Sequence, residues 1–346
     1  MGLIIVSNCR PNSGWGTYTE NLLHATGERA EVLYLFGSSD EKCKSQNIYY
    51  KNPSWFGENY ARVFPQIFFK NLIKQFKELR KDGSVLHYSY NLLPYLGHTR
   101  EDIVTIHDTV FLSRYTRDDF LKKEYSKHLL TRFMSFQNIL TVSHHTKKQL
   151  QSMGCLSEIE VIYPPYSNSF YKMHDKILAR RTLGLPLNKI LVLSPSNTKP
   201  WKNLTNVFRV MKELGDDYQL VRVGKDIGTG ISFSNVDPTV LNMIYNSCDL
   251  LLFPSLEEGF GFPLVEAMRV GLPAVVSDIG IFHEIGRNAV QYVNPMDVSS
   301  IVNGIKIALN QKENLSERGI ERSKEFAMEI FSKKMLNYYK KVIPYF

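Results

Sequence analysis

The chain alternates short, continuous apolar runs with longer amphipathic stretches, and it completes this pattern twice. The runs of the first series are residues 3–6, 32–36, 85–87, 103–106 and 139–142, and those of the second are 190–193, 219–223, 250–253, 274–277 and 291–293. Continuous apolar strands between helices are typical of a parallel sheet that is covered on both faces. Two such series predict an α/β protein built from two doubly wound, Rossmann-like domains.

A proline-containing segment separates the two series. Residues 163–168 read Tyr-Pro-Pro-Tyr-Ser-Asn, and paired prolines can continue neither a helix nor a central strand. We therefore expect an N-terminal domain over residues 1–165 and a C-terminal domain over residues 166–324. Residues 316–342 form a long helical pattern that no strand follows.

The composition agrees with two globular domains, since 346 residues divide into about two units of about 150. With 43% hydrophobic and 22% charged residues, the chain is neither disordered nor collagen-like. No apolar run approaches the ~18 residues of a membrane span, and no charged segment precedes the first apolar run as in a secretory signal. Four widely spaced cysteines exclude a disulfide framework and fit a reducing, cytoplasmic compartment.

The net charge of +8 favours anionic partners, but it does not choose among phosphorylated small molecules, acidic membranes and nucleic acid. No recognition-helix, RRM or KH pattern occurs, so we do not expect nucleic acid binding. Residues 67–81 form a basic amphipathic stretch. It predicts either peripheral contact with the inner face of a membrane or a helix that packs its apolar face on the sheet.

The densest chemical signal is residues 254–268, Pro-Ser-Leu-Glu-Glu-Gly-Phe-Gly-Phe-Pro-Leu-Val-Glu-Ala-Met. A glycine-rich turn between a strand and a helix presents free backbone N–H groups to an anion, and Gly259 and Gly261 allow a phosphate to approach closely. Glu258 and Glu266 flank this turn, and carboxylates are good acceptors for sugar hydroxyls. The string predicts a nucleotide-sugar site; the alternative is a tight turn with two surface acids.

This segment resembles the Glu-x7-Glu motif of glycosyltransferase family 4, whose members are retaining enzymes of the GT-B fold. The resemblance continues through residues 271–277, 283–286 and 294–297, and it covers most of the chain, most strongly in the C-terminal half. It implies two Rossmann-like domains that face a cleft, with a final helix at about 325–346 returning to the first domain. It also implies a nucleotide-sugar donor held mainly by the second domain.

The resemblance further implies individual roles in the C-terminal domain. Glu258 would bind hydroxyls of the transferred sugar, Glu266 the ribose, and Val236 would lie beside the nucleobase. The distal phosphate would meet the turn formed by Gly259, Phe260, Gly261, Phe262 and Pro263.

A second match to the family is residues 194–203, Ser-Pro-Ser-Asn-Thr-Lys-Pro-Trp-Lys-Asn. Lys202 stands where the family has a lysine that neutralises the diphosphate, and such a cation stabilises charge that grows in the transition state. Many members carry an arginine six residues earlier, where this chain has Ser196. Lys199, or the polar groups of Ser196 and Asn197, could replace it; Lys199 is equally consistent with a solvated loop lysine.

The N-terminal domain carries weaker signals. A dinucleotide fingerprint would need Gly or Ala where Thr19 stands and an acid after the second strand, so we do not expect NAD. The resemblance places Gly14 and Gly16 near the donor phosphates and the acceptor, although a plain tight turn explains them as well. His107 follows a strand, and the family commonly has a histidine there, close to the transferred sugar; orienting sugar hydroxyls fits it better than acting as sole base.

The activity implied is transfer of a hexose, with retention, from a GDP- or UDP-sugar to a glycan or lipid-linked acceptor. No Asp-x-Asp sequence occurs, so we expect neither metal nor cofactor, with Lys202 and backbone dipoles in place of a divalent cation. The alternatives are a nucleotide-sugar epimerase of the same fold, an inverting glycosyltransferase, and a non-catalytic scaffold that binds nucleotide sugars.

Overall fold

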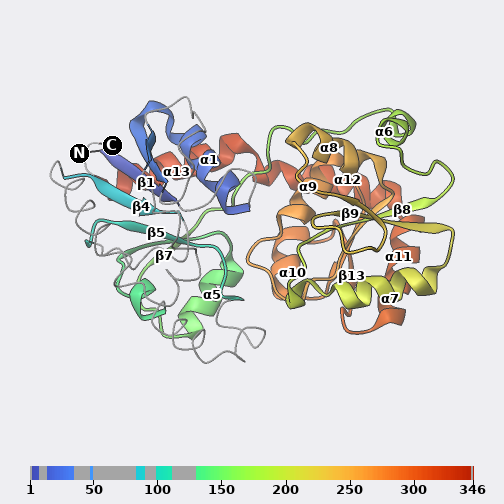
Figure 1. The fold of residues 1–346 in the computed structure, drawn as a ribbon. Helices are drawn as coiled ribbons and strands as arrows, with labels where there is room; N and C mark the ends of the chain where they lie inside the picture. Colours follow the sequence, from blue (N-terminus) through green and yellow to red (C-terminus); the bar gives the residue numbers. More distant parts are fainter. Residues whose placement is uncertain are drawn as a thin grey trace, which may run out of the picture. The chain divides into compact units, whose positions relative to one another are not determined.

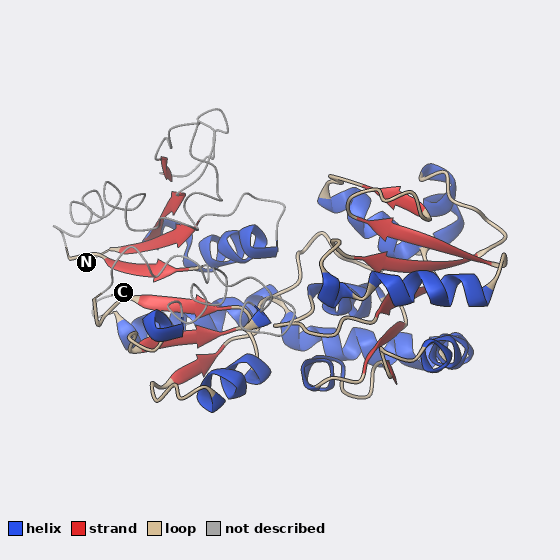
Figure 2. Cartoon of the chain, turned by 60° about the horizontal axis from the view of Figure 1, so that its bottom comes forward, coloured by secondary structure: helices blue, strands red, loops and turns tan. Residues whose placement is uncertain are grey.

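The computed structural model describes residues 2–7, 14–34, 47–49, 83–89, 99–110, 130–343 and 346. The chain forms two compact units: Met1–Pro164 together with Met328–Phe346 is unit 1, and Pro165–Ala327 is unit 2. Each unit contains one parallel sheet flanked by helices (Figure 1, Figure 2). The predicted architecture of two α/β units is thus confirmed. None of the helices in the described ranges is both long enough and apolar enough to cross a bilayer.

The sheet of unit 1 has the strand order β3-β2-β1-β4-β5-β6-β7, with every neighbouring pair parallel. Its strands are β1 (Leu3–Ser7), β2 (Ala30–Tyr34), β3 (Asn47–Tyr49), β4 (Val85–Tyr88), β5 (Ile103–Ile106), β6 (Asn138–Thr141) and β7 (Ile159–Val161). The edge strands β3 and β7 were not predicted, because each has only three residues and neither is a continuous apolar run.

The described helices of unit 1 are α1 (Gly14–Thr26), the 3₁₀ helix η1 (Gly27–Arg29), α5 (His144–Ser152) and α13 (Met328–Val342). Gly14 and Gly16 lie in the first turn of α1 rather than in a tight turn before it. Helix α13 packs against α1. The basic stretch 67–81 lies outside the described residues.

The sheet of unit 2 has the order β10-β9-β8-β11-β12-β13 and is also parallel. Its strands are β8 (Ile190–Pro195), β9 (Tyr218–Val223), β10 (Ile231–Phe233), β11 (Leu250–Phe253), β12 (Ala274–Ser277) and β13 (Gln291–Val293). The direction of winding reverses between β8 and β11. Strand β10 was not predicted, because its three residues include Ser232 and are only half-buried.

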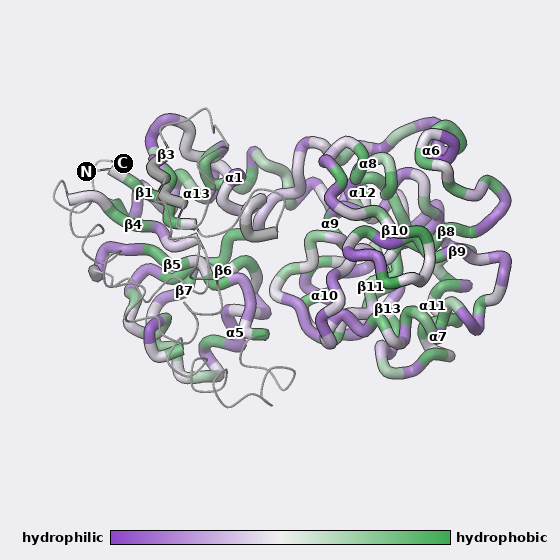
Figure 3. The backbone as a smooth tube through the Cα atoms, in the orientation of Figure 1, coloured by the Kyte–Doolittle hydropathy of each residue, from purple (hydrophilic) through white to green (hydrophobic). Residues whose placement is uncertain are grey.

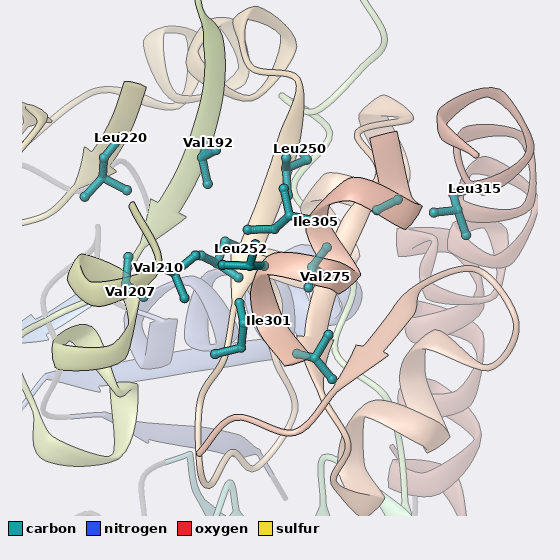
Figure 4. Close-up of a cluster of buried hydrophobic side chains, with 13 residues drawn as sticks. Val192, Val207, Val210, Leu220, Leu250, Leu252, Val275, Ile301, Ile305 and Leu315 are labelled. Carbon is teal, nitrogen blue, oxygen red and sulfur yellow. The ribbon is translucent and has the colours of Figure 1, made fainter. Parts of the chain in front are cut away.

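Helices cover this sheet. They are α6 (Lys176–Thr182), η6 (Pro200–Lys202), α7 (Leu204–Leu214), α8 (Pro238–Ser247), α9 (Phe262–Val270), α10 (Gly280–Gly286), α11 (Val298–Asn310), α12 (Lys312–Ser323) and η7 (Lys324–Phe326). Figure 4 shows the core on one face, where Leu220 and Leu252 of the sheet pack with Val210 of α7 and Ile301 of α11. In Figure 3 the central strand β11 is hydrophobic throughout, which matches its complete burial.

The helical pattern over 316–342 is not one helix. It is interrupted by η7 and by Ala327, which is extended at φ −73° and ψ 150°, and the chain passes from unit 2 to unit 1 at this point. Phe326 is buried in unit 2 and Phe331 in unit 1. Ile330, which directly precedes Phe331 in α13, is 39% exposed.

Candidate functional site

The reversal of strand order between β8 and β11 marks the edge of unit 2 where open α/β sheets bind ligands. The loops that follow these two strands are joined at this edge. The backbone N–H of Leu256 donates to the Trp201 carbonyl at 2.7 Å, and Nδ2 of Asn203 donates to the Pro254 carbonyl at 3.1 Å. The structure therefore brings together the two sequence segments that carried the family resemblance.

Asn203 is a positioning residue that sequence reasoning did not single out. It adopts a left-handed conformation at φ 58°, which Asn tolerates better than most residues. Its amide also donates to the Pro295 carbonyl at 2.7 Å, so it links the loops after β8, β11 and β13. The only sequence signal for this role is its place directly after Lys202 at the start of α7.

Lys202 and Glu258 form an ion pair across the joined loops. Both side chains are largely buried, with 15% and 12% of their surface exposed, and the Lys202 ammonium lies 5.4 Å from the centre of the Phe253 ring. The two residues to which the resemblance assigns separate partners thus neutralise each other. An anion that enters here competes with the Glu258 carboxylate for the ammonium.

The amino-terminal end of α9 lies in the loop after β11. Gly261 caps this helix at φ 99°, and a Cβ atom there would come within 3.0 Å of the Phe282 ring, so only glycine fits. The first N–H groups of a helix have no acceptor within it, and the dipole makes this end positive. Since Pro263 has no N–H, the amides of Gly261 and Phe262 are the donors that this turn presents to an anion.

Phe260 contributes to packing through its ring. The side chain is buried and lies edge-on to the rings of Phe262 and Phe326, at centroid distances of 5.3 Å and 5.7 Å. Any contact of Phe260 with a ligand therefore has to come from its backbone. The aromatic cluster fixes the turn from which α9 starts.

Glu266 extends from α9 and accepts a hydrogen bond at 2.6 Å from the Tyr245 hydroxyl of α8. Burial of the carboxylate raises the pKa of Glu266 to about 7, although the hydrogen bond from Tyr245 opposes this shift. Burial likewise raises the pKa of Tyr245, so the phenol stays protonated and keeps donating. Sequence reasoning found Glu266 but missed Tyr245, which looked like one of several apolar positions of its helix.

The loops after β8, β9 and β10 are also joined. The Ser196 N–H donates to the Val223 carbonyl at 3.2 Å, and the Ser234 hydroxyl donates to the Gly224 carbonyl at 2.6 Å. Lys199 is exposed, whereas the Ser196 hydroxyl is buried. Val236 is half-buried in the loop between β10 and α8. The structure thus gathers the remaining candidate residues of unit 2 along one sheet edge.

Buried hydroxyl groups without a partner within the protein accumulate at this edge. Ser196, Ser232, Ser255 and Ser277 each lie in or just after a strand of the unit 2 sheet, and the side-chain oxygen of each is buried and unpaired. Buried polar groups are nearly always hydrogen-bonded. These hydroxyl groups make this edge of the sheet polar, independent of any motif.

His107 follows β5 in unit 1. Its Nε2 lies 2.9 Å from the Ser89 carbonyl oxygen, which can only accept, so Nε2 carries the proton. Burial lowers the pKa of His107 to about 4, against the opposing effect of this hydrogen bond. The Tyr18 ring of α1 stands edge-on to it at 4.7 Å. His107 is therefore a neutral ring at physiological pH rather than a cation.

A buried chain of hydrogen bonds supports Tyr18. Thr105 lies 3.2 Å from the Tyr18 hydroxyl and 2.7 Å from Nε2 of His87, while Nδ1 of His87 lies 2.6 Å from the Tyr339 hydroxyl. Burial lowers the pKa of His87 to about 3, so this network carries no charge. It links α1, β4, β5 and α13. The one sequence signal was a histidine within an otherwise apolar strand.

Within the described ranges, no three His, Cys, Asp or Glu residues are grouped so that they could hold a metal ion. Residues 175–326 match the family described as glycosyl transferases group 1. The matched residues run from the start of α6 to η7. Both loops of the sheet edge described above, and all of α9, fall within the matched range.

Glycosyltransferases are also among the proteins that this chain resembles in sequence. The chain is 31% identical over 215 residues to the O-antigen chain mannosyltransferase RfbU of Salmonella typhimurium, covering 60% of each protein. It is 31% identical over 126 residues to O-antigen chain mannosyltransferase B of Escherichia coli, covering 36% of this chain and 33% of that protein. The alignments thus span less than two thirds of these relatives.

Solved structures extend the likeness to the whole chain. Sucrose-phosphate synthase from Thermosynechococcus elongatus is 18% identical with a TM-score of 0.82 over 99% of both chains. Anabaena Alr3699/HepE in complex with UDP and glucose is 16% identical with a TM-score of 0.79, over 98% of this chain and 99% of that one. WaaG, a glycosyltransferase involved in lipopolysaccharide biosynthesis, is 15% identical with a TM-score of 0.76, over 97% and 98%. At these identities the likeness establishes the GT-B fold.

Proposed function

We propose that this chain is a retaining glycosyltransferase that moves a hexose from a GDP- or UDP-sugar to a glycan or lipid-linked acceptor. The observation that carries the proposal is the convergence of the Lys202–Glu258 pair and the amino-terminal end of α9 at the β8/β11 switch point. Further support comes from Alr3699/HepE, whose structures are complexes with UDP, glucose and UDP-glucose. Two relatives are O-antigen mannosyltransferases, which favours a glycan product.

The donor diphosphate binds at the start of α9 and exchanges places with the Glu258 carboxylate as the partner of Lys202. The ammonium and the amides of Gly261 and Phe262 then face the charge that grows on the leaving phosphate. Glu258, released from Lys202, accepts hydrogen bonds from hydroxyls of the sugar. One anion thus replaces another at Lys202, which limits the cost of leaving a buried charge unpaired.

The nucleoside is held by the neighbouring elements. Ionised Glu266 accepts hydrogen bonds from the ribose hydroxyls while Tyr245 fixes its orientation, and the loop containing Val236 lies beside the base. Ser196 and Lys199 belong to the loop that borders the diphosphate.

The reaction proceeds on one face of the sugar, and the leaving phosphate accepts the proton of the acceptor hydroxyl. His107, as a neutral ring, orients hydroxyls of the transferred sugar, and the first turn of α1 with Gly14 and Gly16 contributes backbone near the substrates. Lys202 and the helix amides supply the positive charge, so no divalent metal and no cofactor take part. We place the enzyme in the cytoplasm, with peripheral contact to the inner membrane face when the acceptor is lipid-linked.

The test is to incubate the purified chain with UDP-, GDP- and ADP-sugars and to follow release of the nucleoside diphosphate. Slow hydrolysis of one donor without acceptor identifies the sugar and base, and NMR of the product reports its anomeric configuration. An inverted product contradicts the retaining mechanism. Conversion of the donor to an isomeric sugar without acceptor would indicate a nucleotide-sugar epimerase instead. Failure to bind any of these donors would favour a non-catalytic scaffold protein.

A further inference from the structure

Arg222 occupies an unusual position at the carboxyl end of β9. It is in register with Ser194 of β8 and Ser232 of β10, and its side chain is wholly buried. Alternate residues of a strand share a face, so Arg222 lies on the same face as Leu220, which packs with Val207 of α7. Arg222 therefore lies on the face of the sheet that α7 covers, close to the carboxyl edge where the candidate site lies.

The guanidinium joins two loops of the site. Nη2 donates to the Ser196 carbonyl at 3.1 Å and Nη1 donates to the Lys225 carbonyl at 3.1 Å, while the buried Nε–H has no partner within the protein. The loops after β8 and β9 lie very close together. A Cβ atom on Gly224 would come within 2.7 Å of the Ser196 carbonyl oxygen. Arg222 thus fixes the backbone of Ser196, which stands at the position where many members of the family carry an arginine.

The positive charge of Arg222 is not neutralised by an ion pair. Among the described residues, no carboxylate lies within salt-bridge distance of it, and the carboxylate whose charge acts on it is that of Asp226, in the exposed loop after β9. Lys202, by contrast, is paired with Glu258. Burying an unpaired cation costs stability, and neutral side chains could bond the same two carbonyls.

We propose that Arg222 is a positioning residue of the diphosphate subsite: from below the loop it supplies positive charge to the phosphates and holds Ser196 in place. This inference rests on the proposed function. It assigns the role of the missing family arginine to a different strand, rather than to exposed Lys199 or to the buried Ser196 hydroxyl. A purely structural role predicts equal losses for all nucleotides, whereas the electrostatic role predicts losses that increase with phosphate charge.

Calorimetric titration with uridine, UMP and UDP, and with guanosine, GMP and GDP, separates these roles. For whichever set of ligands the wild type binds, uridine or guanosine, Arg222→Gln should weaken binding of the diphosphate roughly tenfold. It should leave the affinity for the nucleoside unchanged. Arg222→Lys, which keeps the charge, should restore most of this loss. Equal weakening of nucleoside and diphosphate, or unchanged diphosphate affinity, overturns the inference.

Two surface variants control for folding and for net charge. Asp226→Asn preserves the turn in which this side chain accepts from the Gly228 N–H at 2.9 Å, and it should tighten diphosphate binding about twofold. Lys212→Gln removes an exposed charge from the last turn of α7, at the opposite edge, and should change nothing. An unaltered affinity in Asp226→Asn contradicts the inference even if Arg222→Gln does not fold. A wild type that binds neither diphosphate overturns the proposed function together with this inference.

Discussion

Replacing Glu266 with Gln should stabilise the protein increasingly as the pH rises above 4.5, with nearly the full gain at pH 7 and above. Burial raises the pKa of this carboxyl from 4.5 to about 7, so the folded protein prefers the protonated form. At 1.36 kcal/mol per pKa unit this difference is worth about 3 kcal/mol. Because Glu266 keeps part of its surface in contact with solvent, we take about 2 kcal/mol as the expected effect.

The sign follows from the direction of the shift. The contribution of the protonated carboxyl is fully present below pH 4.5 and is lost as the pH rises through about 7. At pH 8 the wild type carries a buried charge in the folded state, whereas the amide of the Glu266→Gln variant is neutral and still accepts from Tyr245. The gain is therefore largest at pH 8 and mostly absent at pH 5.

Thermal unfolding of the full chain at both pH values measures this effect. For a unit of this size, about 2 kcal/mol raises the unfolding midpoint by about 4 to 8 °C. Glu258→Gln is the matched control, because it removes the partner of Lys202 and should lower the midpoint at pH 8. A Glu266→Gln protein that is destabilised at pH 8, or equally stabilised at both pH values, would refute the reasoning. Glu266→Gln should also bind the donor more weakly at pH 8. A variant that is more stable but binds the donor less well would indicate that the Glu266 carboxylate serves binding rather than stability.

Three further outcomes test the site. Lys202→Ala should lower turnover by about two orders of magnitude or more while circular dichroism shows an intact fold, since the leaving diphosphate loses its cation; unchanged turnover would remove Lys202 from the mechanism. Gly261→Ala should cost about 1–3 kcal/mol of unfolding free energy in denaturant titrations and weaken diphosphate binding, because φ 99° and the Phe282 ring exclude a side chain; wild-type stability would contradict this. A chelator should leave transfer rates unchanged, and a block that Mg²⁺ or Mn²⁺ reverses would disprove the metal-independent mechanism.

The sequence alone was sufficient to predict two parallel α/β units and the glycine turn that opens a helix within residues 254–268. Continuous apolar runs identify buried strands because burial on both faces leaves no polar positions, and a glycine turn before a helix is encoded locally. The three-residue strands β3, β7 and β10 were missed because an edge strand needs no continuous apolar run. The break at Ala327 was also missed, because the helices on both sides of it bury residues at similar intervals and the apolar spacing therefore continues across it.

Only the tertiary structure decided which polar side chains meet. Lys202 and Glu258 are 56 positions apart, and His87 and Tyr339 are 252 apart. No local pattern specifies such pairs, because they depend on the order of strands in the sheet and on where each loop leaves it. Arg222 illustrates the same limit: its position in a strand predicts burial, but only the packed sheet brings its guanidinium to the Ser196 carbonyl. Local periodicity determines which residues are buried, whereas strand order determines what they are buried against.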